Sequence, residues 1–197
     1  MSDDERVISW FEENYKGLIV GVIIGLSTLF LYKSYISNQN ISQLELSREF
    51  DIAVQSYQEG NNAKILEFSE LNMEKNPDNI YTSLANLYSA KLMYAEDKIN
   101  SSYVFLNHII NHSKDEDIID IAKYRKAKLL VEENKLDEAH NVLGNMPDNY
   151  QHNELKGDIF YLENNFEDAF NQYNIVLTFE ITPNERKNIL AKINLVK

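Results

Sequence analysis

The 197-residue chain contains no cysteine, only 3 prolines and only 6 glycines. Without cysteine the protein has no thiol nucleophile, disulfide framework or thiolate metal site, and an oxidising compartment is permitted but not required. Tight β-turns depend on glycine and proline, so the scarcity of both residues argues against an all-β fold. These absences favour a helical protein.

Positive charge is also scarce, because 19 Lys and Arg residues face 31 Asp and Glu residues, giving a net charge of −12 at pH 7. Binding a polyanion requires a net basic face, so we expect no nucleic-acid partner. A hydrophobic fraction of 44% and a mean hydropathy of −0.42 are typical of a globular chain rather than a disordered one. The length suits about one domain of ordinary size.

One stretch departs from this polar average, because residues 17–32 are sixteen uncharged positions between Lys16 and Lys33. A spanning helix needs about 20 residues, and snorkelling lysines with nearby aromatic side chains make this run long enough. Those aromatic residues are Trp10, Phe11, Tyr15, Tyr32 and Tyr35. The run is apolar all round, unlike a soluble core helix, and it lacks the basic start and cleavage site of a signal peptide. We therefore expect an uncleaved single-pass anchor.

The anchor predicts three segments: a tail over residues 1–16, a transmembrane helix over 17–36 and a domain over 37–197. The domain carries 26 acidic and 16 basic residues, a net charge of −10, because residues 1–36 hold 5 of the 31 acidic and 3 of the 19 basic residues. Positive charges flank the two sides of the anchor almost equally. The positive-inside rule alone therefore does not orient it.

Within the anchor, Gly17, Gly21 and Gly25 recur every four residues and so lie on one helix face. Small residues at this spacing allow a second membrane helix to approach closely. The alternative is that glycine is simply frequent in membrane helices. We expect this face to pack against a partner helix.

From residue 41 onward, apolar residues recur at spacings of 3 and 4 between short polar breaks, which indicates successive helices. Residues 132–139 align with residues 162–169, and a third copy lies upstream. The aligned columns hold Ala90, Ala127 and Gly157; Met93, Leu130 and Phe160; Ile99, Leu136 and Phe166; Ser102, Ala139 and Ala169; and Leu106, Leu143 and Tyr173. The small columns mark where the two helices of a hairpin touch, and the large residues fill the space beside them.

This column pattern resembles the tetratricopeptide repeat, although the usual period of about 34 residues is not kept. Residues 47–75 predict a weaker first hairpin, and the capping box of Thr182-Pro183-Asn184-Glu185 predicts a last helix over about residues 183–195. The expected fold is all-α: an N-terminal transmembrane helix, then a degenerate tetratricopeptide-like array of helical hairpins with a C-terminal capping helix.

Several short motifs lie in a fixed order along nearly the whole chain. They are Trp10-Phe11, the run from Gly17 to Gly25, Tyr81-Thr-Ser-Leu-Ala-Asn-Leu, Arg125-Lys-Ala-Lys-Leu, Leu155-Lys-Gly-Asp, Thr182-Pro183 and Lys192-Ile-Asn-Leu. In these motifs and in its layout the chain resembles the bacterial YfgM family of ancillary SecYEG translocon subunits. The resemblance implies a non-enzymatic inner-membrane protein with a cytoplasmic N-terminus and a periplasmic repeat domain.

The same resemblance implies partners and a role. The expected partners are the SecYEG translocon, a PpiD-type periplasmic chaperone and unfolded client proteins. The role would be to help newly translocated proteins reach periplasmic chaperones. A tethered repeat scaffold for envelope assembly or cell division is the alternative that the fold would serve equally well.

In a tetratricopeptide array the first helix of each hairpin lines the concave surface. Mapping those columns onto this sequence gives a candidate partner groove that includes Leu87, Tyr94, Tyr124, Lys128, Glu154 and Tyr161. Tyrosine suits such a surface because it offers a large contact area and a hydroxyl group. The alternative is that Leu87 and some of the tyrosines are buried between repeats.

Signals for chemistry are weak. His108 and His112 share a helix face, but the sequence His-Ile-Ile-Asn-His lacks the glutamate and third ligand of a zinc site, so we expect a solvated helix end and no metal. Basic residues cluster at Lys123, Arg125, Lys126 and Lys128. In an acidic domain this cluster favours an intramolecular or partner contact. We expect no catalytic residue and no cofactor.

Overall fold

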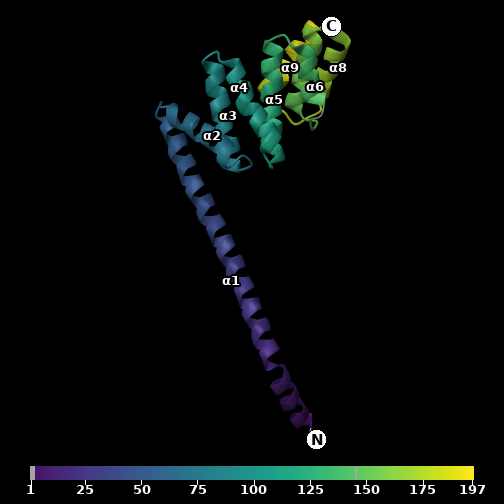
Figure 1. Cartoon of the computed structure of the whole chain (residues 1–197). Coiled ribbons are helices and arrows are strands. Elements are labelled where there is room, and N and C mark those ends of the chain that lie inside the picture. Colours follow the sequence, from purple (N-terminus) through teal and green to yellow (C-terminus); the bar gives the residue numbers. More distant parts are fainter. Residues whose placement is uncertain (1–2, 145) are drawn as a thin grey trace. The chain divides into compact units, whose positions relative to one another are not determined.

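The structure is a computed structural model that describes residues 3–144 and 146–197. These residues form α-helices joined by short turns, and no strand occurs among them (Figure 1). The helices are α1 (Asp3–Gln58), α2 (Ala63–Lys75), α3 (Ile80–Ala95), α4 (Ile99–His112), α5 (Glu116–Glu132), α6 (Leu136–Gly144), α7 (Tyr150–Leu162), α8 (Phe166–Val176) and α9 (Pro183–Leu195). The chain divides into two compact units, Met1–Glu49 and Phe50–Lys197.

The first unit contains one stretch, Asn14–Ser34, that is long and apolar enough to cross a membrane. Every described side chain in this stretch is exposed, including those of Phe30 and Tyr32. A contiguous apolar surface of this size is unfavourable in water and is covered when lipid surrounds it. Phe11 and Tyr35, which we expect at the membrane interface, lie outside the residues whose side chains are described.

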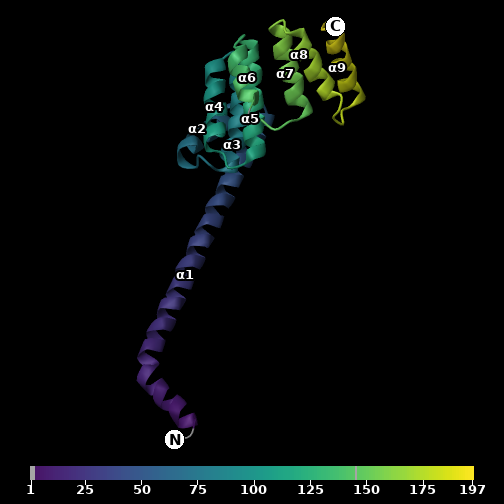
Figure 2. The ribbon, with the colours of Figure 1, turned by 90° about the vertical axis from the view of Figure 1, so that its right-hand side faces the viewer.

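The second unit is built from helical hairpins that follow one another along the chain (Figures 1 and 2). The C-terminal part of α1 contacts α2 through the rings of Phe50 and Phe68. Further along, α3 pairs with α4, α5 with α6 and α7 with α8, and α9 packs on α8. Consecutive first helices also touch, because α3 contacts α5 and α5 contacts α7. The expected fold of stacked hairpins closed by a C-terminal helix is confirmed.

Each hairpin turn uses the same helix cap. Gly60, Asp97, Asn134 and Asn164 have φ values of 88°, 59°, 58° and 61°, in the left-handed region that Gly, Asn and Asp tolerate best. The residue after each one donates its N–H to a carbonyl five positions back, as Lys135 does to Leu130 at 2.8 Å. This Schellman arrangement provides hydrogen-bond donors for the last carbonyl groups of one helix. It also reverses the direction of the chain before the next helix begins.

The aligned small columns lie at the contact between the two helices of each hairpin. Ala90, Ala127, Gly157, Ala139 and Ala169 are all buried. The large residues beside them form the core, and Ala127 belongs to a cluster with the buried leucines of α5, α6 and α7. Because each helix surface is apolar where its neighbour sits, the core continues from one hairpin to the next.

In the last hairpin the small column holds glycine, its smallest residue, and the partner column holds tyrosine, its largest. Gly157 lies against the buried ring of Tyr173, and a Cβ atom on Gly157 would sit 2.5 Å from Cε1 and 2.7 Å from Cδ1 of that ring. In the preceding hairpin the same two columns hold Ala127 and Leu143. The glycine therefore makes room for the aromatic ring of its partner column.

We expect Gly157→Ala to destabilise the protein, because the overpacking cost of about 1–3 kcal/mol outweighs a gain in helix propensity of about 1 kcal/mol. In a Tyr173→Leu background, which recreates the Ala127–Leu143 pair, the same substitution should become stabilising. Urea unfolding of the full-length protein in detergent, followed by circular dichroism, measures both effects. An unchanged sign in the two backgrounds would contradict the steric account.

Buried polar contacts link α2 to the second hairpin and also hold α3 and α4 of that hairpin together. Ser69 and Ser89 hydroxyl oxygens lie 2.7 Å apart, and Asn86 Nδ2 lies 3.1 Å from His108 Nδ1. His108 Nε2 lies 3.2 Å from the carbonyl oxygen of Met73. The sequence suggests a solvated helix end for His108, but the structure shows a side chain that is only 8% exposed. The position is buried because α2 and α3 both cover this face of α4.

Burial lowers the pKa of His108, and the stacked ring of His112 lowers it further, while the hydrogen bond to Met73 acts in the opposite direction. A histidine with a depressed pKa in the folded state takes up its proton more readily when unfolded. Its contribution to stability is therefore lost as the pH falls below about 6.5.

We accordingly expect the free energy of unfolding to be lower at about pH 5 than at about pH 7. His108→Gln should reduce this difference, because glutamine keeps a hydrogen-bonding group but does not titrate. His140→Gln is the matched control, since that imidazole lies on the surface beside Glu163. Equal pH dependence in the wild type and the His108 variant would refute the assignment.

Candidate partner-binding surface

The first helices α3, α5 and α7 carry the residues of the predicted groove. The structure brings Tyr94 and Lys128 together, with Lys91 beside them, around a pocket of 280 Å³ between α3, α4 and α5, which we call the α3–α5 pocket. Its lining residues are Ala90, Lys91, Tyr94, Ser102, Leu106, Arg125, Lys128, Leu129 and Glu132. Part of the predicted groove is therefore a continuous concave surface.

Helical spacing explains why these residues meet. Arg125, Lys128 and Glu132 are three and four positions apart, so they share one face of α5, and Lys91 and Tyr94 share the facing side of α3. The second helix of the hairpin closes the floor, where Ser102 and Leu106 of α4 lie buried. The pocket has a polar, charged rim and a largely apolar floor.

Hydrogen bonds fix part of the rim. The Tyr94 hydroxyl donates to Glu132 Oε2 at 2.8 Å, and this bond raises the pKa of Tyr94. Arg125 Nη1 donates to the carbonyl oxygen of Leu87 at 3.0 Å, and burial of the guanidinium lowers the pKa of Arg125. Tyr94 remains 44% exposed. A partner could therefore contact the tyrosine ring without disturbing the helices.

Two residues of the predicted groove follow the alternative of burial between repeats, Leu87 fully and Tyr124 in part. Leu87 is only 8% exposed and belongs to the core, because it faces the interior of the stacked hairpins. Tyr124 is half-buried, packs against the core of α5, α6 and α7, and places its ring 5.6 Å from that of His152. Burial raises the pKa of Tyr124, with the carboxylates of Glu154 and Asp158 adding to the effect. Tyr124 thus holds α5 and α7 together.

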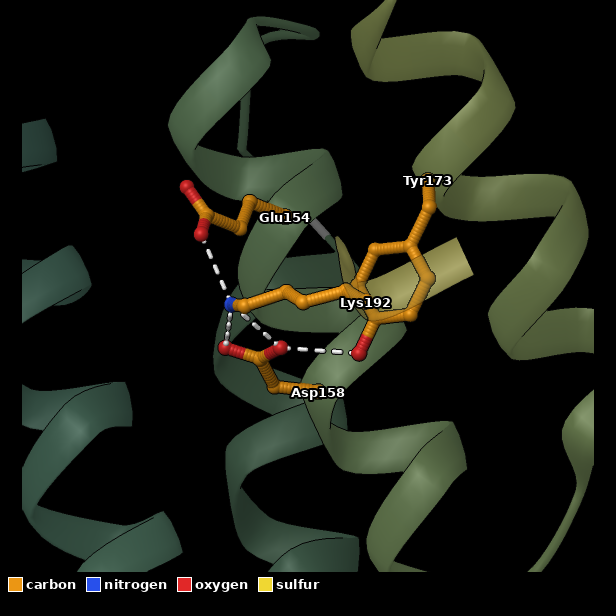
Figure 3. Close-up of polar contacts among 4 residues, drawn as sticks. All are labelled: Glu154, Asp158, Tyr173 and Lys192. Atoms are coloured by element: carbon orange, nitrogen blue, oxygen red, sulfur yellow. Dashed lines mark hydrogen bonds and ion pairs between the residues drawn. The ribbon is translucent and has the colours of Figure 1, made fainter. Parts of the chain in front are cut away.

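Lys192 of the capping helix α9 reaches the acidic residues Glu154 and Asp158 of α7 (Figure 3). Lys192 Nζ of α9 lies 2.7 Å from Glu154 Oε1 and 2.7 and 2.8 Å from the two Asp158 carboxylate oxygens. The Tyr173 hydroxyl of α8 donates to Asp158 Oδ1 at 2.8 Å. Glu154 is therefore engaged within the protein, in contrast to its expected place in an open groove.

These contacts stabilise the charged form of Lys192. Burial opposes the charge, but the hydrogen bonds to Asp158 and Glu154 outweigh it and raise the pKa of Lys192. The ammonium group also lies 5.7 Å from the centre of the Tyr173 ring, within the range of a cation–π contact. One lysine thus ties α9 to both helices of the last hairpin.

The remaining predicted residue, Tyr161, is 38% exposed near the end of α7. Its ring lies 5.8 Å from that of Phe166, which begins α8 and is also exposed. The two aromatic rings form a small apolar patch at the hairpin turn. This patch and the α3–α5 pocket are the accessible parts of the predicted groove.

The basic cluster on α5 is partly an intramolecular contact. Lys126 Nζ donates to Asn107 Oδ1 of α4 at 2.8 Å, whereas Arg125 and Lys128 turn to the α3–α5 pocket. The mapped groove columns do not include Arg125, Glu132 or Lys192. Arg125 and Glu132 could have been found from their spacing to Lys128, because all three lie on one face of α5. No local sequence pattern indicates that Lys192 contacts α7.

Stacked hairpins with an accessible surface on their first helices define a tetratricopeptide-like repeat protein. The sequence model of the tetratricopeptide repeat-like domain matches residues 9–196. The chain belongs to this family. No solved structure matches the chain.

Several curated relatives carry the name ancillary SecYEG translocon subunit, which confirms the resemblance to the YfgM family. The protein of Haemophilus influenzae is 24% identical over 183 residues, covering 93% of this chain and 80% of the relative. That of Escherichia coli is 27% identical over 139 residues, covering 71% and 66%. That of Buchnera aphidicola from Schizaphis graminum is 29% identical over 122 residues, covering 60% and 63%, which is less than two thirds of its length.

We expect Lys192→Met to lower the free energy of unfolding by about 1–2 kcal/mol, because two neighbouring carboxylates lose their shared cation. Lys187→Met is the matched control, since Lys187 is exposed on the same helix and its loss should cost less than about 0.5 kcal/mol. Urea unfolding of the full-length protein compares the two. Equal effects would show that the Lys192 contacts contribute no more than a surface charge.

Proposed function

We propose that the protein is a membrane-anchored protein–protein interaction module that associates with the SecYEG translocon. The observation that carries this proposal is the family match over residues 9–196, which includes both the apolar segment and the hairpin array. The relatives from Haemophilus influenzae and Escherichia coli are named ancillary SecYEG translocon subunits. An array of stacked hairpins suits binding, because its surface is extended and its core needs no cofactor.

The finer parts of the proposal rest on the resemblance to the YfgM family. The N-terminus lies in the cytoplasm, the chain crosses the inner membrane once, and the hairpin array lies in the periplasm. There it meets a PpiD-type chaperone and helps newly translocated proteins reach periplasmic chaperones. The protein acts by holding its partners and catalyses no reaction.

Two surfaces suit the two kinds of partner. The α3–α5 pocket and the exposed ring of Tyr161 offer the array an accessible contact surface. The glycine face of α1 suits a membrane helix, because a Cβ atom on Gly17, Gly21 or Gly25 would meet nothing within 4 Å. A larger side chain there leaves α1 itself undisturbed, so any defect reports on a partner.

We expect Gly21→Leu combined with Gly25→Leu to reduce co-purification of the translocon about five- to tenfold, because the bulk keeps a partner helix away. Ser27→Leu is a matched small-to-large control on another face of the same helix, where the side chain is also exposed. The measurement is quantitative mass spectrometry of the full-length protein purified from mild detergent.

Photo-crosslinking from the glycine face identifies the partner directly. Crosslinks to translocon subunits support the proposal. Crosslinks to cell-division or cell-wall proteins instead would replace it with the alternative of a tethered envelope scaffold. Equal translocon recovery from the glycine variant and the Ser27 control would exclude this face as the contact.

A further inference from the structure

The α3–α5 pocket gathers three cations that have no carboxylate partner. Lys91 and Lys128 are exposed at its rim, and among the described ion pairs neither takes part. Arg125 is bonded to a backbone carbonyl oxygen rather than to a carboxylate. The single acidic lining residue is Glu132, which already accepts the hydrogen bond of Tyr94.

Other lysines of the same array do have carboxylate partners. Lys98, Lys135 and Lys192 each contact a carboxylate, as expected for a domain whose acidic residues outnumber its basic ones. In the pocket, three like charges share 280 Å³, and the guanidinium of Arg125 is part-buried against the carbonyl oxygen of Leu87. Repulsion and desolvation both raise the free energy of the empty pocket. An anionic group that enters it would lower that free energy.

The apolar floor of the α3–α5 pocket sets a second requirement for a ligand. Ala90, Leu106 and Leu129 present buried apolar side chains below the charged rim, and the ring of Tyr94 stands beside them. A small inorganic anion would satisfy the cations but would leave this apolar surface uncovered. A ligand that carries a carboxylate next to an apolar group satisfies both.

We propose that the α3–α5 pocket binds an extended peptide segment in which a Glu or Asp side chain lies next to a large apolar side chain. The carboxylate lies among Lys91, Arg125 and Lys128, and the apolar side chain covers the floor beside Tyr94. The inference deepens the proposed function and rests on it, because it gives the chemistry of the protein segment that this surface holds.

An anionic membrane surface fits the same cations less well. Contact with a bilayer needs a broad basic face, whereas the residues after position 36 carry a net charge of −10 and would be repelled by acidic lipids. The cations are also confined to one pocket of limited volume. These features favour a single side chain over a lipid surface.

The test measures fluorescence anisotropy of a labelled peptide that alternates Leu and Glu and has both ends blocked, with the full-length protein in detergent micelles. We expect this peptide to bind and its Gln-for-Glu counterpart to bind about tenfold more weakly, because the charge-assisted hydrogen bonds are lost. Binding should also weaken as the salt concentration rises.

Variants locate the site. Lys91→Gln with Lys128→Gln should weaken binding of the Glu peptide about tenfold. Lys64→Gln with Lys75→Gln makes the same change in net charge at two exposed positions of α2, and it should alter binding by less than about twofold. Glu132→Gln should tighten binding about twofold, because it removes the opposing carboxylate while leaving an acceptor for Tyr94.

Four results would overturn the proposal. They are equal affinity for the Glu and Gln peptides, equal losses in the pocket and control variants, binding only when the peptide has a free C-terminal carboxylate, and displacement of the peptide by phosphatidylglycerol vesicles but not by neutral ones. Loss of translocon crosslinking at the glycine face would leave the peptide measurement unchanged. Failure of the proposed function and failure of this inference are therefore distinguishable.

Discussion

The close approach of two helices at a pair of small residues is the constraint on which the array depends. Each hairpin is closed where a residue such as Ala127 meets the large residue of its partner column, and the last hairpin needs Gly157 because that partner is Tyr173. The repeated cap at Asp97, Asn134 and Asn164 returns the chain at the distance that this contact requires. Stacking of successive hairpins then buries one continuous core.

That core also decides which part of the surface stays open. Leu87 and Tyr124 belong to first helices, yet stacking turns them toward the interior. Tyr94, two helical turns beyond Leu87, and Lys128, one turn beyond Tyr124, remain accessible. At the far end, Lys192 of α9 binds the carboxylates of Glu154 and Asp158 on α7. The lining of the α3–α5 pocket holds three basic residues and one acidic residue, although the domain as a whole is acidic.

Local patterns predicted the architecture well, because the hairpin columns, the turn positions and the capping box at Thr182 all depend on residues close in sequence. The candidate site was predicted only in part. The places of Tyr94 and Lys128 on the surface follow from helical spacing. The pairing of Glu154 with Lys192 spans 38 positions and depends on how α9 packs against the last hairpin. The burial of His108 likewise depends on α2 and α3, which its own helix does not reveal.

The contact of Lys192 affects how the array unfolds from its C-terminal end. In a solenoid each repeat normally holds only its neighbours, so the ends fray one element at a time. Lys192 reaches past α8 to α7 and so links elements that are not consecutive. Opening α9 alone would expose two carboxylates without their cation. The C-terminal end is thereby made into a single cooperative block of three helices, whose amide protons should exchange with solvent together rather than in sequence.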